Sequence, residues 1–136
     1  MKRAILDTDT VSYYFRKEPK VVEKVDSYVD AYGSVSLSVV TYYEVMNGLY
    51  FKDAKKQLKQ FEDFLRLCEV IPITLSSAKI SAKIFAGLRN TGQLIGHNDA
   101  LIAGNAMEGD LTLITNNVRD FGKIKGLRIE NWTLRK

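Results

Sequence analysis

The sequence has little sulfur and little imidazole: its 136 residues include one cysteine, Cys68, and one histidine, His97. A single cysteine cannot form an intrachain disulfide or a thiolate zinc cluster. One histidine likewise excludes a histidine-rich metal site. If the protein binds a metal ion, oxygen atoms of other side chains must supply the ligands.

Long apolar runs are also missing. None approaches the roughly 20 residues that a membrane-spanning helix needs. The N-terminus begins like a signal peptide, but Asp7 and Asp9 interrupt the apolar run after Ala4–Leu6. We therefore expect a cytoplasmic protein without a membrane partner.

The residues that are present are typical of one globular domain spanning residues 1–136. Hydrophobic residues make up 46% of the chain and charged residues 26%, which excludes disorder as the main state. The net charge is +4, from 20 basic and 16 acidic residues. This excess is a weak indication of a polyanionic partner. The indication strengthens if several acidic side chains gather in one site, because the remaining surface is then more basic.

Hydrophobic spacing predicts strands and helices that alternate along the chain. The expected strands are Lys2–Leu6, Val35–Ser38, Val70–Ile73, Leu111–Thr115 and an edge strand at Leu127–Ile129. The expected helices are Thr10–Arg16, a segment from Pro19 to a break at Ala31–Gly33, Val39–Tyr50, Ala54–Leu67, a segment from Ser76 or Ser77 to Leu88, Asn98–Glu108 and Val118–Lys123. Small residues in the helix at 98–108, Gly104 among them, predict close packing on a sheet.

Short apolar strands that alternate with helices indicate an α/β fold. We expect a mostly parallel central sheet of four to five strands with helices on both faces, in three layers. Ligands of such sheets bind outside the carboxyl ends of the strands. Residues that directly follow a strand are therefore the candidates for chemistry.

Acidic and amide side chains occupy these positions after several strands or at helix starts. They are Asp7, Asp9, Glu44, Asp99, Asn116, Asn117 and Asp120. Clustered carboxylates repel one another unless a cation neutralises them. Mg²⁺ binds carboxylate oxygens and bridges them to phosphates. The pattern therefore suggests metal-assisted hydrolysis of a phosphodiester, in which the metal activates a water molecule.

Each residue also has a purely structural alternative. Asp7 and Asp9 could cap the following helix, and Thr41-x-x-Glu44 matches a capping box. Asp99 at a helix start is a common cap, and Asp120 could be an ordinary surface residue. The joint placement of these residues carries the functional interpretation, because each position alone is weak. We expect His97 in a loop or cap and Cys68 as a small buried hydrophobic residue.

The chain resembles PIN-domain proteins and, more narrowly, VapC-type toxins of type II toxin–antitoxin pairs. Five segments match in order over nearly the whole length. They are Leu6–Asp9, Ser36–Gly48 (SLSVVTYYEVMNG), Gly96–Ala106 (GHNDALIAGNA), Leu113–Phe121 (LITNNVRDF) and Gly126–Trp132 (GLRIENW). Each segment is loose by itself, but five in the same order are specific. The resemblance implies a PIN-like fold and an endoribonuclease that depends on Mg²⁺ or Mn²⁺.

The same resemblance implies roles for individual residues. Asp7 and Asp99 would bind the metal, and Glu44 and Asp120 would complete the catalytic set. Thr8, Asp9 and Asn117 would position the phosphate or the water ligands of the metal. The implied partners are a VapB-type antitoxin, RNA and a second copy of the chain. Lys17, Arg119 and Lys123 are expected to bind the RNA backbone by charge.

Two positions depart from the family pattern. Asp9 stands where relatives commonly carry Asn or Ser, and its extra charge would enlarge the metal site or tighten metal binding. Asn116 and Asn117 are amides, and Asn117 lies where some relatives carry an acid. This argues against a second metal ion held by protein ligands alone.

Two other classes of protein compete with the nuclease. Asp7-Thr8-Asp9-Thr10-Val11 also fits the opening of haloacid-dehalogenase-like phosphatases, in which Asp7 would be the nucleophile. Too little chain follows Thr115 to complete that class of site. The third class is a degenerate PIN module that binds RNA without cutting it, and the intact acidic set argues against this class.

Overall fold

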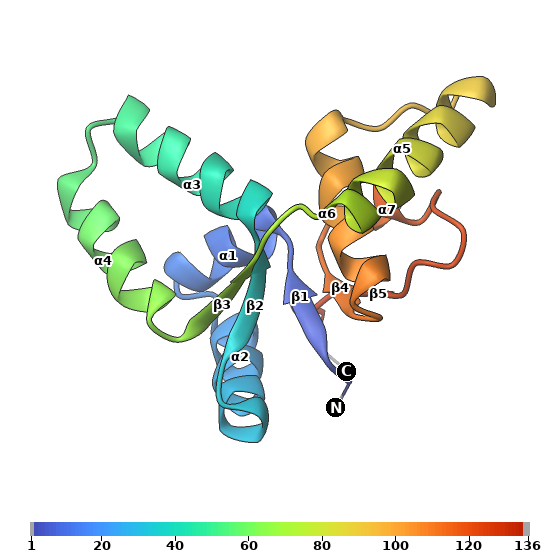
Figure 1. Cartoon of the computed structure of the whole chain (residues 1–136). Coiled ribbons are helices and arrows are strands. Elements are labelled where there is room, and N and C mark those ends of the chain that lie inside the picture. Colours follow the sequence, from blue (N-terminus) through green and yellow to red (C-terminus); the bar gives the residue numbers. More distant parts are fainter. Residues whose placement is uncertain (1, 135–136) are drawn as a thin grey trace.

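A computed structural model describes residues 2–134 as five strands connected by helices (Figure 1). The strands are β1 (Ala4–Leu6), β2 (Val35–Ser38), β3 (Cys68–Ile71), β4 (Thr112–Ile114) and β5 (Ile129–Glu130). The helices are α1 (Thr8–Phe15), α2 (Pro19–Tyr32), α3 (Val39–Phe51), α4 (Lys55–Leu65), α5 (Leu75–Asn90), α6 (His97–Glu108) and α7 (Val118–Phe121). The alternation expected from the sequence is confirmed, and most boundaries differ by one or two residues.

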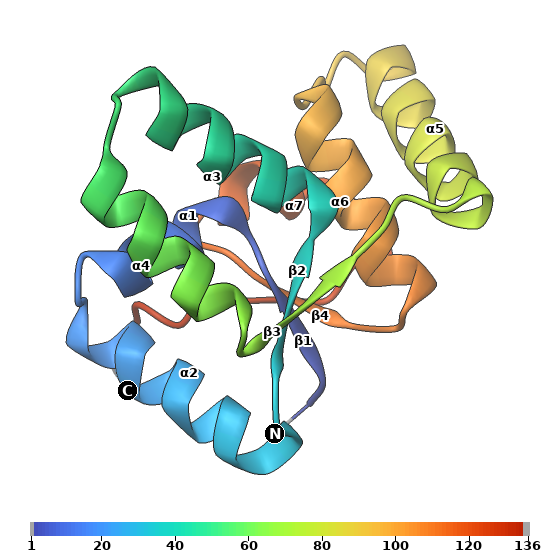
Figure 2. The ribbon, with the colours of Figure 1, turned by 60° about the vertical axis from the view of Figure 1, so that its left-hand side comes forward.

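All five strands run parallel in the order β3-β2-β1-β4-β5 (Figure 1), and Figure 2 turns the edge with β3 toward the viewer. The chain builds the sheet outward from β1 in one direction through β2 and β3, then returns to the other side of β1 for β4. The strand order thus reverses between β1 and β4, where Leu6 pairs with Ile114. The residues next in line, Asp7 and Thr115, therefore lie side by side at the crevice where α/β sheets bind ligands.

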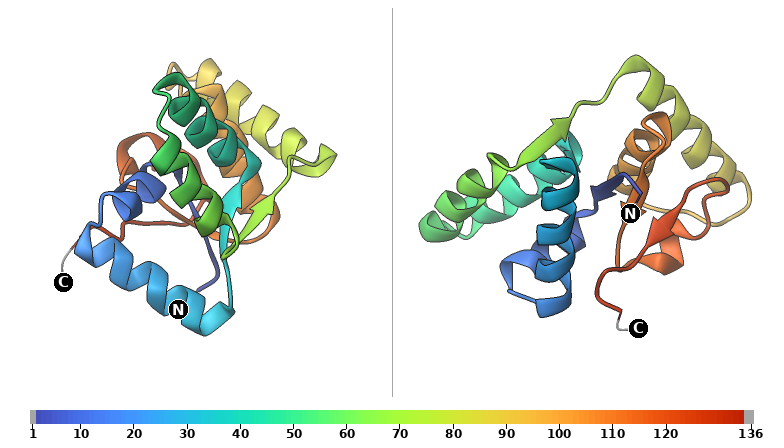
Figure 3. Two further views of the ribbon diagram at one scale, coloured as in Figure 1. Left: turned by 90° about the vertical axis from the view of Figure 1, so that its left-hand side faces the viewer. Right: turned by 90° about the horizontal axis from the view of Figure 1, so that it is seen from below.

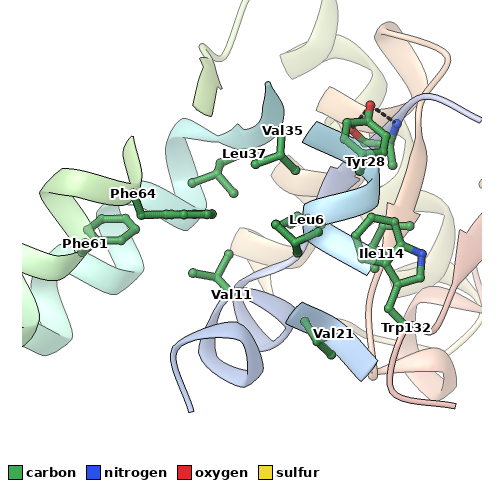
Figure 4. Packing of buried hydrophobic residues seen from close by; sticks show 12 residues of the cluster. Leu6, Val11, Val21, Tyr28, Val35, Leu37, Phe61, Phe64, Ile114 and Trp132 are labelled. Carbon is green, nitrogen blue, oxygen red and sulfur yellow. Dashed lines mark hydrogen bonds between the residues drawn. The ribbon is translucent and has the colours of Figure 1, made fainter. Parts of the chain in front are cut away.

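Helices cover both faces of the sheet, so the three-layer α/β arrangement is confirmed. In Figure 3, seen from below, the blue and green helices lie on one side of the strands and the yellow and orange helices on the other. Leu6 packs toward α1, α2 and α4, with Tyr28 and Phe61 in the same cluster (Figure 4). Ile5 points the opposite way and packs with residues of α5, α6 and α7. Successive side chains of a strand alternate between faces, so both faces of β1 are buried.

Two expected boundaries are wrong for identifiable reasons. The third strand covers Cys68–Ile71 rather than Val70–Ile73, because Pro72 has no N–H to donate to a neighbouring strand. Helix α5 is capped by Thr74 rather than by Ser76 or Ser77. The Thr74 hydroxyl accepts from the Ser77 amide, and Ser77 is the reciprocal partner in this capping box.

The expectation that Gly104 packs on the sheet is also wrong, because Gly104 faces α5. A Cβ atom there would overlap Ser81 Oγ and lie 2.7 Å from the carbonyl oxygen of Ser77. The Ser81 side chain can move, but the backbone carbonyl cannot. Glycine therefore sets how closely α5 and α6 approach.

Gly104→Ala is expected to lower the free energy of unfolding by about 1–3 kcal/mol, the usual cost of overpacking. Gly87→Ala is the matched control, because a Cβ atom at Gly87 meets no atom within 4 Å and alanine favours helix. Urea unfolding of the two variants checks the difference. Equal stability of the two would contradict the packing argument.

A buried hydrogen-bonded pair joins α6 to the ends of two strands. Ser38 Oγ donates to Asn105 Oδ1 at 2.6 Å, and Asn105 Nδ2 donates to the Pro72 carbonyl at 3.0 Å. Ser38 also caps α3 by accepting from the Val40 amide. These contacts fix the start of α3 and the C-terminal half of α6 relative to the sheet, and both helices carry candidate site residues.

Within residues 2–134, no helix is both long enough and apolar enough to cross a membrane.

Candidate active site at the carboxyl edge of the sheet

Asp7 is buried at the reversal of strand order and is hydrogen-bonded to Thr115. Its side chain is 5% exposed, and Thr115 Oγ1 donates to Asp7 Oδ2 at 2.8 Å. Asp7 occupies the position before α1, yet its carboxylate makes no capping hydrogen bond. Helix capping therefore does not explain this residue.

Asp99 lies across the crevice in the first turn of α6 and is half-buried. Gly96, and not Asp99, precedes the first turn as the cap residue. The pKa of Asp99 is raised to about 6, mainly by burial and then by the carboxylates of Glu44, Asp120 and Asp9, in that order. Asp99 is therefore within electrostatic range of acidic groups from three other segments.

The pKa of Asp7 is raised still further, to about 7. Burial is the largest cause, the negative charge of Asp9 follows, and Asp99 adds to it, while the hydrogen bond from Thr115 opposes the shift. Both carboxyls thus resist ionisation in the folded protein. A cation placed between them would reverse this, because opposite charge favours the ionised form.

Glu44 connects the starts of α1 and α6. Thr8 Oγ1 donates to Glu44 Oε1 at 2.6 Å, and Asn98 Nδ2 donates to Glu44 Oε2 at 3.3 Å. The capping-box alternative for Glu44 is wrong, because Ser38 rather than Thr41 caps α3. The two hydrogen bonds hold the carboxylate in place beside Asp99.

Asp9 and Asn116 join α1 to the turn that follows β4. Asp9 Oδ2 accepts a hydrogen bond from the backbone amide of Asn116 at 3.0 Å. The carboxylate of Asp9 is half-buried, and its charge acts on both Asp7 and Asp99. Asp9 therefore contributes negative potential to the site while it orders the neighbouring turn.

Asp120 is held by an amide and by two basic side chains. Asn117 Nδ2 donates to Asp120 Oδ2 at 3.2 Å, and this hydrogen bond is the main reason that the pKa of Asp120 is lowered. Lys123 Nζ lies 3.4 Å and Arg119 Nε 3.6 Å from Asp120 Oδ1. Asn117 also caps α7 through the Asp120 amide. Asp120 thus stays ionised at the rim of the site.

The structure brings Asp7, Asp9, Glu44, Asp99 and Asp120 within electrostatic range, but not into a closed cage. In the described part of the chain, no three Asp, Glu, His or Cys side chains converge closely enough to enclose a metal ion by themselves. Such an open set of oxygen donors fits Mg²⁺, which keeps several waters and uses one or two carboxylates together with substrate phosphates. Asp7 and Asp99 fit that role best, because their charges are the least compensated.

The sequence pattern does not identify Thr115 and Asn98, two polar side chains that bind the acidic residues. In the sequence, Thr115 marks only the end of a strand and Asn98 only the start of a helix. Thr115 directly follows β4, and Asn98 lies in the first turn of α6 beside Asp99. The missing information was the strand order, which makes Thr115 the neighbour of Asp7.

His97 and Cys68 stay outside the chemistry. His97 is the first residue of α6, and its ring lies 4.1 Å from that of Phe85. Cys68 is half-buried in β3, its Sγ lies 3.4 Å from the Phe64 carbonyl oxygen, and burial raises its pKa to about 12. A thiol with so high a pKa is a poor nucleophile.

Comparison with known proteins points to one family. The PIN domain profile matches residues 4–127. The ribonuclease VapC2 of Haemophilus influenzae is 31% identical over 133 residues, covering 97% of this chain and 99% of that protein. The tRNA(fMet)-specific endonuclease VapC of Shigella flexneri is 28% identical, covering 98% of this chain and 100% of that protein.

Solved structures agree with the sequence comparison. The DNA-bound VapBC complex of Salmonella typhimurium contains a chain that is 30% identical, with a TM-score of 0.88 and coverage of 97% of this chain and 99% of that chain. The VapBC2 complex of Rickettsia felis, bound to a promoter fragment, contains one that is 26% identical, with a TM-score of 0.86 and coverage of 95% and 98%. The chain therefore belongs to the PIN-domain family, in the group of the VapC ribonucleases.

Proposed function

We propose that this protein is a metal-dependent endoribonuclease that hydrolyses RNA phosphodiester bonds with Mg²⁺ or Mn²⁺. The observation that carries the proposal is the pair Asp7 and Asp99, two buried or half-buried carboxyls with raised pKa values on facing elements. Such a pair costs stability unless a cation is present. The bound metal would lower the pKa of a water molecule and stabilise negative charge on the phosphate oxygens.

The chain's own residues would prepare this reaction. Asp7, fixed by Thr115, and Asp99 would bind the metal. Glu44, held by Thr8 and Asn98, would orient the attacking water or accept its proton. Asp120, ionised and held by Asn117, would do the same from the other side of the site. Asp9 would strengthen the attraction for the cation.

We further propose that the protein is the toxin of a toxin–antitoxin pair. The support is its likeness to chains of VapBC complexes, two of which were solved with DNA. Its partners would be a VapB-type antitoxin, RNA and a second copy of the chain. An antitoxin arginine would suit the acidic site, because a guanidinium pairs with carboxylates through two parallel hydrogen bonds and would displace the metal.

The test is cleavage of labelled RNA by protein freed of antitoxin, measured in EDTA and with added Mg²⁺ or Mn²⁺. We expect cleavage only with a divalent metal, and calorimetry should detect metal binding that Asp7→Asn removes. Tight RNA binding without cleavage would instead indicate the RNA-binding module. A burst of aspartyl-phosphate on Asp7 with a phosphate ester would indicate the phosphatase.

A further inference from the structure

A groove of about 300 Å³ lies between α5 and the segment that follows α7. Helix α5 contributes Lys83, Ile84 and Leu88, and the segment after α7 contributes Lys123, Ile124 and Lys125. The apolar members belong to the hydrophobic cluster beneath this face of the sheet. The groove therefore has a packed apolar floor and lysines along its walls.

Two of the three wall lysines, Lys83 and Lys125, carry positive charge that no acidic side chain offsets in the described part of the chain. Helix α5 contains Lys79, Lys83 and Arg89 and no Asp or Glu. Lys83 and Lys125 are exposed, and neither forms a salt bridge with any residue between 2 and 134. The groove lining itself includes no acidic residue. These charges are available to a polyanion.

One end of the groove adjoins the acidic site. Lys123 lines the groove, and its Nζ lies 3.4 Å from Asp120 Oδ1. Asp120 in turn acts on Asp99 through its charge. In Figure 1, α5, α6 and α7 form one side of the molecule, beside β4 and β5. A strand cut at the acidic site would meet the lysines directly.

Other basic residues lie in different surroundings. Lys55, Lys56 and Lys59 belong to α4, on the opposite face of the sheet, where Lys59 pairs with Asp63. Lys17 lines a pocket with residues of α1, α2 and α4, so the structure separates it from Lys123. That Lys17 binds the RNA backbone stays a prediction.

We propose that this groove, defined by Lys83, Lys123 and Lys125, binds the phosphodiester backbone of the RNA strand next to the bond that is cleaved. The proposal rests on the proposed function as a ribonuclease. An acidic centre repels RNA, so flanking cations are needed to hold the strand in place. Lysine acts on phosphate as a mobile point charge, so the groove adds affinity for the backbone and no preference for base sequence.

The test removes the two lysines that do not touch Asp120. The Lys83→Gln/Lys125→Gln variant is made in the Asp7→Asn protein, which binds RNA without cutting it. Its affinity for labelled single-stranded RNA is measured from 50 to 200 mM salt and compared with that of the Asp7→Asn parent. Loss of two phosphate contacts should reduce the slope of log K against log salt by roughly 1.4. When salt rises from 50 to 200 mM, the factor by which RNA affinity falls should therefore be roughly sevenfold smaller for the variant than for the parent. In otherwise wild-type protein, KM should rise while kcat changes little.

The matched control is Lys55→Gln/Lys56→Gln, which removes the same charge from exposed positions of α4, outside the groove. It should leave the salt slope close to that of the parent. An unchanged salt slope in the Lys83→Gln/Lys125→Gln variant would overturn the groove proposal. This holds even if the variant binds an antitoxin more weakly than the parent does. Wild-type protein on the same RNA separates the two proposals, because failure of metal-dependent cleavage there would overturn the proposed function itself.

Discussion

Asp7→Asn is expected to lower the rate of RNA cleavage roughly 10³-fold, more than the 10–100-fold that follows loss of a residue supporting a metal ligand. Asparagine keeps an oxygen that can accept the hydrogen bond from Thr115, so the geometry of the crevice is retained. The variant lacks only the charge that attracts the cation. Cleavage rates over a range of Mg²⁺ concentrations measure the effect, and a rate within tenfold of the wild type would contradict the assignment.

The same substitution should stabilise the metal-free fold at neutral and higher pH. The pKa of Asp7 is about 7 in the folded protein and 3.8 ordinarily, so the folded state binds the proton more tightly than the unfolded state. Stability therefore falls as pH rises from about 4 to about 7, and the loss persists above that range. The carboxamide of the variant does not titrate over this range, so Asp7→Asn escapes the penalty.

Thermal unfolding in EDTA at several pH values checks this prediction. The variant's midpoint should exceed that of the wild type at pH 8, and the difference should shrink toward pH 4. Added Mg²⁺ should raise the wild-type midpoint and leave the variant nearly unchanged. A large loss of stability in the variant at every pH would show that Asp7 has a structural role instead.

Asp120→Asn should reduce the cleavage rate by roughly 10²-fold, the scale of one general base or positioning group. Asn117→Ala should cost less. It removes the hydrogen bond that holds the Asp120 carboxylate and caps α7, but it leaves the charge in place. Lys123 and Arg119 also still hold that carboxylate.

Rates at saturating Mg²⁺ for the two single variants and the double variant decide between these roles. If Asn117 acts through Asp120, the double variant should be no slower than Asp120→Asn alone. A larger effect of Asn117→Ala than of Asp120→Asn would assign the fourth active-site position to Asn117. Loss of stability without loss of rate in Asp120→Asn would limit Asp120 to a structural role in the first turn of α7.

The sequence by itself determined the alternation of strands and helices and the kind of residue that follows each strand. Apolar runs such as Val35–Ser38 are local signals, because burial on both faces of a parallel sheet requires them. Pro72 ended a strand for an equally local reason, although the sequence interpretation overlooked it. Asp7 and Asp99 could be predicted as site residues because the carboxyl ends of parallel strands lie at one edge of the sheet.

Only the tertiary structure decided which of these residues meet. The strand order makes Asp7 the neighbour of Thr115, 108 residues away, and the packing of α1, α3 and α6 brings Thr8 and Asn98 to Glu44. Gly104 faces α5 and not the sheet, which periodicity within a single helix cannot reveal. Contacts between distant segments depend on strand order and on side-chain volumes across the interface. A local sequence pattern contains neither the strand order nor these volumes. The hydrogen-bonded pairs, the burial of Asp7 and the raised pKa values of Asp7 and Asp99 therefore depend on the folded structure.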